Sequence, residues 1–168
     1  MNWIPYSIKE EAFSPFAEFG DRWALLSAGT EDAWNTMTVS WGQVGVLWGK
    51  NVATIYVRPQ RYTHTFIENC DRFSLSFFPE SARSVLSYCG KYSGRDVNKA
   101  AATGLSPTFD QGAVFFDQAE QTIVCRKLYC QRLDPGCFID KECDRRNYHG
   151  DYHDVYIGEI IGSYRAEK

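Results

Sequence analysis

One stretch decides the predicted fold: Asn35-Thr-Met-Thr-Val-Ser-Trp-Gly42, a Gly- and Trp-rich connection, Asn51-Val-Ala-Thr-Ile-Tyr-Val57 and Arg58-Pro-Gln-Arg-Tyr-Thr63. In the first segment apolar and hydroxyl side chains alternate, which predicts a strand with one packed face and one polar face. The polar face would carry Thr36, Thr38 and Ser40. The second segment is rich in β-branched residues and predicts another strand, which ends at Pro59 because proline lacks a donor for the ladder.

The second strand runs into a predicted helix over residues 61–70. Tyr62, Phe66 and Cys70 recur at a spacing of four, as on one face of a helix. Arg58 and Arg61 then lie beside unpaired N–H groups at the helix start, and this combination is suited to a phosphate. The alternative is that both arginines are solvated surface charges. The hydroxyl face of the preceding strand favours the binding site.

The rest of the chain predicts a mainly β fold, an antiparallel β-barrel with short helices. Strands are expected at 22–28, 72–78, 113–116, 121–133 and 154–163, the fourth long enough to carry a bulge. Helices are expected at 80–89, ended by Gly90, and at 99–103, capped by Asp96 and closed by Gly104, with one helical turn near residues 13–19. Residues 137–151 predict a charged, irregular excursion. Such closely spaced strands favour a barrel over a doubly wound sheet.

Composition narrows the class of protein. A chain of 168 residues fits one domain over 1–168, and 44% hydrophobic residues are enough for a single core. The net charge of −3 argues against a nucleic-acid partner. No apolar run suits a signal peptide or a membrane span, so a cytoplasmic location is expected. The glycine-rich fingerprints of dinucleotide and P-loop sites are absent.

The six cysteines are expected to be reduced thiols, mostly small and buried, because the chain shows no secretion signal. The last four, together with His149 and His153, could be drawn as a metal cluster. They contain no Cys-x-x-Cys pair, and two of them fall in a predicted strand, so no metal site is predicted. His149 is expected to be an exposed loop residue.

The opening stretch also resembles the flavin reductase-like proteins with an FMN-binding split barrel, flavoredoxin among them. The similar segments are Asn35–Gly42, Val44–Trp48, Arg58–Thr63, Ser93-Gly-Arg-Asp96 with Lys99, and His153-Asp-Val-Tyr-Ile-Gly-Glu159. From the first of these segments to the last, the resemblance extends over most of the chain. The excursion at 137–151 matches no segment of the family, so its role does not follow from the resemblance.

The resemblance implies an FMN site at a homodimer interface. The contacts with FMN that the resemblance implies are Asn35, Thr36, Ser40, Trp41, Arg58, Thr63 and Lys99. The hydroxyl face of the strand adds Thr38, and the cationic start of the helix adds Arg61. Arg58, Arg61, Thr63 and Lys99 would bind phosphate, and Trp41 would form a wall for the ring. The alternatives are a core tryptophan and a solvated lysine. His153 is similar to a histidine near the nicotinamide or the reactive flavin edge, although a histidine before a strand can also be structural.

The implied function is an FMN-dependent oxidoreductase of the flavin reductase type. It would move electrons from NAD(P)H to flavin and on to an acceptor that the sequence does not identify. One alternative is a non-catalytic FMN-binding protein or an electron carrier. A second, within the split-barrel group, is an enzyme similar to pyridoxamine phosphate oxidase, which no set of residues specifically favours.

Overall fold

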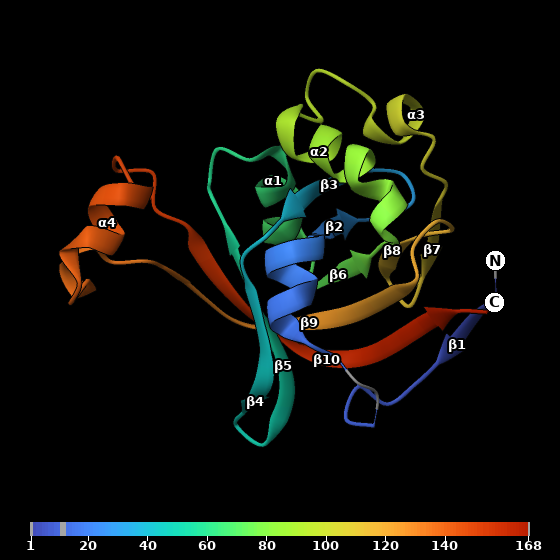
Figure 1. Cartoon of the computed structure of the whole chain (residues 1–168), viewed down its shortest axis with the longest axis horizontal. Helices are drawn as coiled ribbons and strands as arrows, with labels where there is room; N and C mark the ends of the chain where they lie inside the picture. Colours follow the sequence, from blue (N-terminus) through green and yellow to red (C-terminus); the bar gives the residue numbers. More distant parts are fainter. Residues whose placement is uncertain (1, 11–12, 168) are drawn as a thin grey trace.

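A computed structural model of the chain describes residues 2–10 and 13–167 (Figure 1). The strands are β1 (Trp3–Pro5), β2 (Ala24–Gly29), β3 (Trp34–Val39), β4 (Gly42–Leu47), β5 (Lys50–Val57), β6 (Arg72–Phe77), β7 (Pro107–Asp110), β8 (Ala113–Phe116), β9 (Gln121–Arg132) and β10 (Asp154–Ala166). The α-helices are α1 (Tyr62–Asn69), α2 (Arg83–Lys91), α3 (Lys99–Thr103) and α4 (Lys141–Asn147). A π-helical segment covers Phe16–Arg22, and 3-10 turns cover Glu80–Ala82 and Pro135–Cys137.

The main sheet has the strand order β3-β2-β6-β9-β10-β5-β4, with β1 paired to the far end of β10. Every pairing is antiparallel, and β7 and β8 form a separate two-stranded sheet. Among the described strands the hydrogen-bonded path stays open between β3 and β4. The prediction of a mainly β, antiparallel split barrel with short helices is confirmed.

Two groups of buried side chains stabilise this arrangement. The larger one fills the inside of the curved sheet and includes Phe73, Leu75 and Ile55, each fully buried. The second lies beneath α2 and α3 and includes Leu86 and Phe116. At about 25 cal/mol per Å² of apolar area, such burial is the dominant favourable contribution to folding.

The long strands β9 and β10 are bent where they pair. Their register shifts between Ile157 and Gly158 and again between Ile160 and Gly162. A Cβ on Gly158 would lie 2.8 Å from the ring of Phe73, so only glycine allows this close approach. The bulge predicted for residues 121–133 is therefore confirmed, and the bend curves the sheet around the core.

Several predicted elements were wrong in detail. The Gly- and Trp-rich connection after Gly42 is strand β4, an edge strand with mostly exposed side chains. The short helix α3 is capped by the side chain of Asn98, which accepts a bond from the N–H of Ala101, and not by Asp96. Gly90 lies inside α2, which continues to Lys91. Strands β1 and β7 were not predicted from the sequence.

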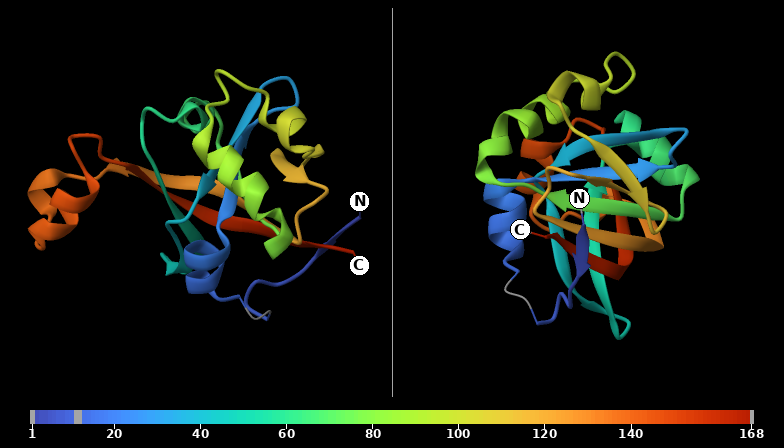
Figure 2. Two further views of the ribbon diagram at one scale, coloured as in Figure 1. Left: turned by 45° about the horizontal axis from the view of Figure 1, so that its top comes forward. Right: turned by 90° about the vertical axis from the view of Figure 1, so that its right-hand side faces the viewer.

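The excursion at 137–151 is not irregular throughout, because it contains helix α4. Asp140 is its N-cap, with its carboxylate accepting from the N–H of Glu142. In Figures 1 and 2 this segment projects from the body of the molecule, beyond the ends of β9 and β10. His149 is exposed in the loop after α4, as predicted. None of the helices in the described part of the chain is long and apolar enough to cross a membrane.

Candidate functional site

Three adjoining cavities lie where β3, β5, α1, α2 and the loop before α3 meet. The cationic cavity, of about 410 Å³, includes Arg58, Arg61, Thr63 and Lys99 in its lining. The aromatic cavity, of about 390 Å³, includes Ser40, Trp41, Tyr56 and His153. The outer cavity, of about 460 Å³, includes Asn35, Thr36 and Lys99. Each predicted site residue lines at least one of the three, Thr38 lining the aromatic cavity.

The cationic and aromatic cavities are neighbours, because Met37, Arg58 and Arg61 line both. The cationic cavity is lined by Arg58, Arg61, Lys91, Arg95 and Lys99 against one carboxylate, that of Asp96. Arg61 is also the N-cap residue of α1, where no side chain caps the first turn and the positive end of the helix dipole lies. This excess of positive charge makes the cationic cavity suited to an anion.

Lys99 is a buried lysine with defined partners. Its ammonium group donates to the carbonyl of Thr36 at 2.8 Å and to the carbonyl of Cys89 at 2.7 Å. Only 6% of the residue is exposed, so the alternative of a solvated lysine is wrong. Burial lowers the pKa of Lys99, and the charge of Arg61 lowers it further, against an opposite effect of Cys89.

Asn35 and Thr63 connect β3 to α1 at the wall between the cavities. The side-chain amide of Asn35 donates to the hydroxyl of Thr63 at 2.8 Å, and both residues are buried. The loop at Gly94 passes so closely that a Cβ there would lie 2.0 Å from Oδ1 of Asn35. The Ser-Gly-Arg-Asp segment therefore uses its glycine for close contact with β3.

The predicted hydroxyl face of β3 was wrong in part. The Thr36 hydroxyl is fully buried and bonds to the hydroxyl of Ser27 at 2.8 Å. The Thr38 hydroxyl donates to the carbonyl of Leu86 at 2.5 Å. Helix α2 covers this face, so the alternation was predicted well but both faces of the strand are packed. Ser40, just beyond the strand, is exposed.

Trp41 and His153 form the wall of the aromatic cavity. Their ring centroids are 5.1 Å apart, and Tyr56 lies 6.5 Å from His153 on another side. Trp41 is 43% exposed, so the alternative of a core tryptophan is wrong. An exposed indole beside a cavity offers a flat apolar surface to a ligand.

His153 is 8% exposed, and its Nδ1 lies 3.0 Å from the hydroxyl of Tyr148. Burial, reinforced by the charges of Arg58 and Arg61 and opposed by Asp154, lowers the pKa of His153 to about 4. The imidazole is therefore neutral near pH 7. One ring nitrogen is bonded to Tyr148, and the ring as a whole lines the aromatic cavity.

Other residues at the site were not predicted as site residues. The excursion reaches Arg58, whose guanidinium pairs with the carboxylate of Asp151 and donates to the carbonyl of Asn147 at 2.9 Å. Arg95 lies over the ring of Tyr62, with 4.7 Å between its guanidinium carbon and the ring centroid. The signal for Arg95 was its place in the Ser-Gly-Arg-Asp segment. Asp151 had no such signal.

The cysteines are not part of this site except for Cys89. All six are free, but Cys130, Cys137 and Cys143 are exposed, which corrects the expectation of mostly buried thiols. Burial raises the pKa of the Cys125 thiol well above its usual range. Within residues 2–10 and 13–167 no three His, Cys, Asp or Glu side chains are grouped as metal ligands.

The fold and the cavities together define the class of a split-barrel protein with a positively charged cavity next to an aromatic one. The chain belongs to the flavin reductase like domain family, whose model matches residues 16–168. A comparison with curated proteins gives no match.

Three solved structures have the same fold. Flavoredoxin from Methanosarcina acetivorans is 22% identical, with a TM-score of 0.67 over 87% of this chain and 69% of that chain. An FMN-binding protein from Thermus thermophilus with bound p-hydroxybenzaldehyde is 20% identical, with a TM-score of 0.68 over 96% and 81%. The styrene monooxygenase flavin reductase from Pseudomonas putida S12 is 18% identical, with a TM-score of 0.63 over 86% and 79%.

Proposed function

We propose that this protein is an FMN-dependent oxidoreductase of the flavin reductase type, which moves electrons from NAD(P)H to flavin and on to an acceptor. It would act in the cytoplasm as a homodimer, with residues 1–168 as one domain. Membership of the flavin reductase like family supports the class of reaction. The FMN-binding protein and the flavoredoxin among the similar structures support the choice of FMN.

One observation carries the proposal: the cationic and aromatic cavities are neighbours that share Met37, Arg58 and Arg61 in their linings. FMN has an anionic phosphate at one end and a flat, largely apolar ring at the other. Two adjacent cavities, one lined by cations and the other by Trp41 and Tyr56, are complementary to both. The volumes fall in the range typical of small-molecule sites.

In this proposal each wall has a defined role. Arg61 and the first N–H groups of α1 bind the phosphate, with Arg58, Thr63 and Lys99 around it. Asn35 holds Thr63 in place through their 2.8 Å hydrogen bond. Ser40 and the main chain of β3 contact the ribityl chain. When bound, FMN supplies the hydride and electron-transfer chemistry, which the protein positions and shields.

His153 would act as a neutral hydrogen-bonding group beside the ring. With a pKa of about 4, His153 adds no third positive charge beside Arg58 and Arg61 at neutral pH. The contact with Tyr148 fixes the orientation of the imidazole. We therefore assign His153 a role in orienting the nicotinamide or the flavin edge.

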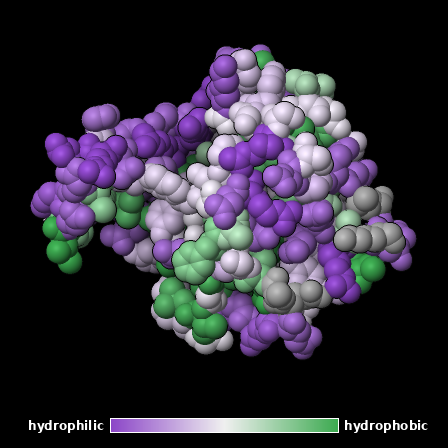
Figure 3. Space-filling model, in the orientation of Figure 1, coloured by the Kyte–Doolittle hydropathy of each residue, from purple (hydrophilic) through white to green (hydrophobic). Residues whose placement is uncertain are grey.

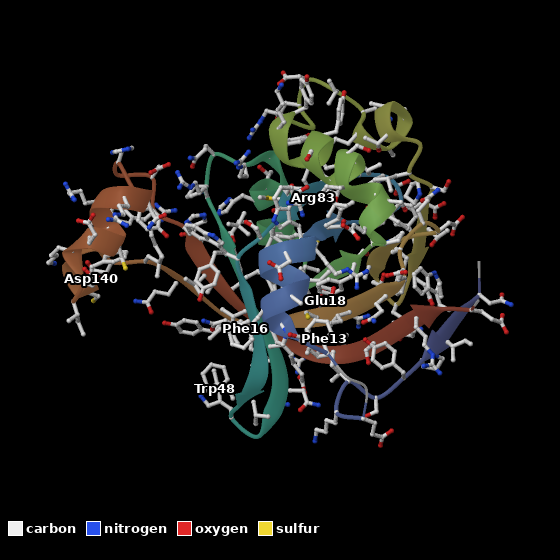
Figure 4. All side chains as sticks on the ribbon, in the orientation of Figure 1. Phe13, Phe16, Glu18, Trp48, Arg83 and Asp140 are labelled. Carbon is white, nitrogen blue, oxygen red and sulfur yellow. The ribbon has the colours of Figure 1, made fainter. Side chains whose placement is uncertain are left out.

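The homodimer is supported by exposed apolar side chains. On the hairpin of β4 and β5, Val46 is 73% exposed and Trp48 is 60% exposed. Figure 3 shows apolar residues gathered over this hairpin, and Figure 4 shows Trp48 at its tip. A patch of this kind on a soluble domain commonly marks a protein interface. The free cysteines are compatible with a reducing compartment.

The test begins with FMN binding, measured by quenching of flavin fluorescence. Arg61→Gln should weaken FMN binding at least tenfold, because one charge-assisted bond to phosphate is lost. The matched control is Arg126→Gln, which removes an equal charge from β9, where Arg126 pairs with Glu159 at 2.5 Å. The control should bind FMN as the wild type does.

The second measurement is anaerobic reduction by NADH or NADPH. It is followed as the loss of the visible absorbance of oxidised flavin. Bleaching of bound FMN supports the oxidoreductase. FMN that binds but stays oxidised with both nicotinamides would indicate the non-catalytic or electron-carrier alternative. Failure to bind or reduce any flavin would refute the proposed function.

A further inference from the structure

The excursion, residues 137–151, has a defined internal structure. Phe138, Tyr148 and Tyr152 form an aromatic cluster, with Tyr148 and Tyr152 stacked at 4.9 Å between ring centroids. The hydroxyl of Tyr152 donates to Asp144 of α4 at 2.8 Å. The peptide N–H of His149 donates to Asp151 at 3.0 Å. The loop that carries Asp151 is therefore fixed by the excursion itself.

Asp151 contacts two residues that line the cationic cavity. Its carboxylate pairs with the guanidinium of Arg58 and accepts a bond from the side-chain amide of Gln60 at 3.3 Å. Arg58 and Gln60 both line the cationic cavity. The side chains of Arg58 and Asp151 are 26% and 31% exposed, so the pair is only partly screened by water.

The chemical consequence is a competition for one cation. Arg58 presents its guanidinium to either a carboxylate or a phosphate oxygen, since both accept the same forked donor geometry. A dianionic phosphate in the cationic cavity would also be repelled by the Asp151 carboxylate. Both effects act on a phosphorylated ligand and leave an uncharged one unaffected.

We propose that Asp151 is a specificity-determining residue that competes with the ligand's phosphate for Arg58 and so limits the preference for FMN over riboflavin. This inference rests on the proposed function. Asp151 lies in the excursion, for which the family resemblance implies no role. The protein would then bind FMN more weakly than it would without the Asp151 carboxylate.

The experiment compares the dissociation constants of FMN and riboflavin in the full-length protein and its variants. Asp151→Asn should tighten FMN binding roughly tenfold, the scale expected for removing one partly screened charge, and leave riboflavin within about twofold. The matched control is Asp144→Asn, which removes an equal charge from the same excursion but leaves the Arg58 contacts in place. It should change neither constant by more than about twofold.

A double variant separates competition from simple folding effects. In an Arg58→Gln background, Asp151→Asn should lose the part of its effect that comes from competition for Arg58 and keep only the part that comes from direct repulsion of the phosphate. Unchanged or weaker FMN binding in Asp151→Asn would overturn this inference while leaving the proposed function intact. Equal tightening of FMN and riboflavin would overturn it as well. If neither flavin binds the wild type, the proposed function fails and this inference fails with it.

Discussion

At the scale of single residues, the state of His153 has a measurable consequence for stability. Its pKa is about 4 in the folded chain and about 6.5 when exposed. Between these values the unfolded chain binds more protons, so the free energy of unfolding falls as the pH drops from 6.5 toward 4. The contribution lost is at most about 3 kcal/mol.

Urea unfolding of the wild type and His153→Gln at several pH values checks this prediction. The variant should lose less stability than the wild type over the same interval. Parallel curves would show that His153 does not titrate as described. Tyr148→Phe, which removes the hydroxyl at Nδ1 but retains the ring, controls for the loss of that hydrogen bond.

Lys99 should be important for folding as well as for binding. Lys99→Met removes the donor to the carbonyls of Thr36 and Cys89 and should lower the free energy of unfolding by about 2 kcal/mol. It should also weaken FMN binding. Lys91→Met, which removes an exposed charge from the same cavity, should cost less than 0.5 kcal/mol, roughly the usual range for surface changes.

The residues of the site could be predicted from the sequence because they occur in short motifs. The partners of their side chains could not. Thr36 and Thr38 had the right alternation, but only the folded structure shows that their hydroxyls bond to Ser27 of β2 and to Leu86 of α2. Asp151 pairs with Arg58 across 93 positions, and no local pattern indicates such a contact.

At the scale of elements, the loop between α2 and α3 depends on a glycine. Gly94→Ala would place a methyl group against Asn35 and disturb its bond to Thr63. We expect a loss of about 1–3 kcal/mol in stability, as for other overpacked sites, and weaker FMN binding. Gly45→Ala is the control, because a Cβ there meets nothing within 4 Å. Equal effects of both changes, in thermal unfolding and FMN titration, would contradict the prediction.

Strong periodicity explains which elements could be predicted. Strand β8 was predicted at its observed bounds, and β6 and α1 within one residue of theirs at each end, because apolar side chains recur regularly along them. Strand β4 has exposed valine and leucine and two glycines, and it is formed by pairing with β5 and not by burial. Helix α4 is polar on most sides. Its one local signal is the N-cap Asp140, labelled in Figure 4.

At the scale of the whole molecule, the exposed tip of the β4–β5 hairpin predicts that two copies of the chain associate. Trp48 has a φ of 53°, a conformation in which asparagine is much better tolerated than tryptophan. Trp48→Asn should weaken the proposed dimer at least tenfold, since exposed tryptophans are frequent interface hot spots. Isolated subunits should be equally or more stable.

Sedimentation equilibrium of the wild type and Trp48→Asn measures this directly. Exposed Tyr129, whose ring lies 6.4 Å from that of Trp48, gives a second variant, Tyr129→Ser, with the same expected direction. A wild-type chain that stays monomeric at high concentration would contradict the proposed dimer.

The pairing of β1 with the end of β10 brings the two ends of the polypeptide together, with Trp3 opposite Ala166. Figure 1 shows both ends at the same side of the molecule, away from α4. A short glycine-serine linker could therefore fuse them, and new termini could be opened elsewhere. Cutting the circularised gene near Gly150 would release the Asp151 side of the excursion from α4 while the sheet retains its connectivity. In such a permutant Asp151 and α4 would stand at opposite ends of the chain, while the strands of the barrel keep their neighbours.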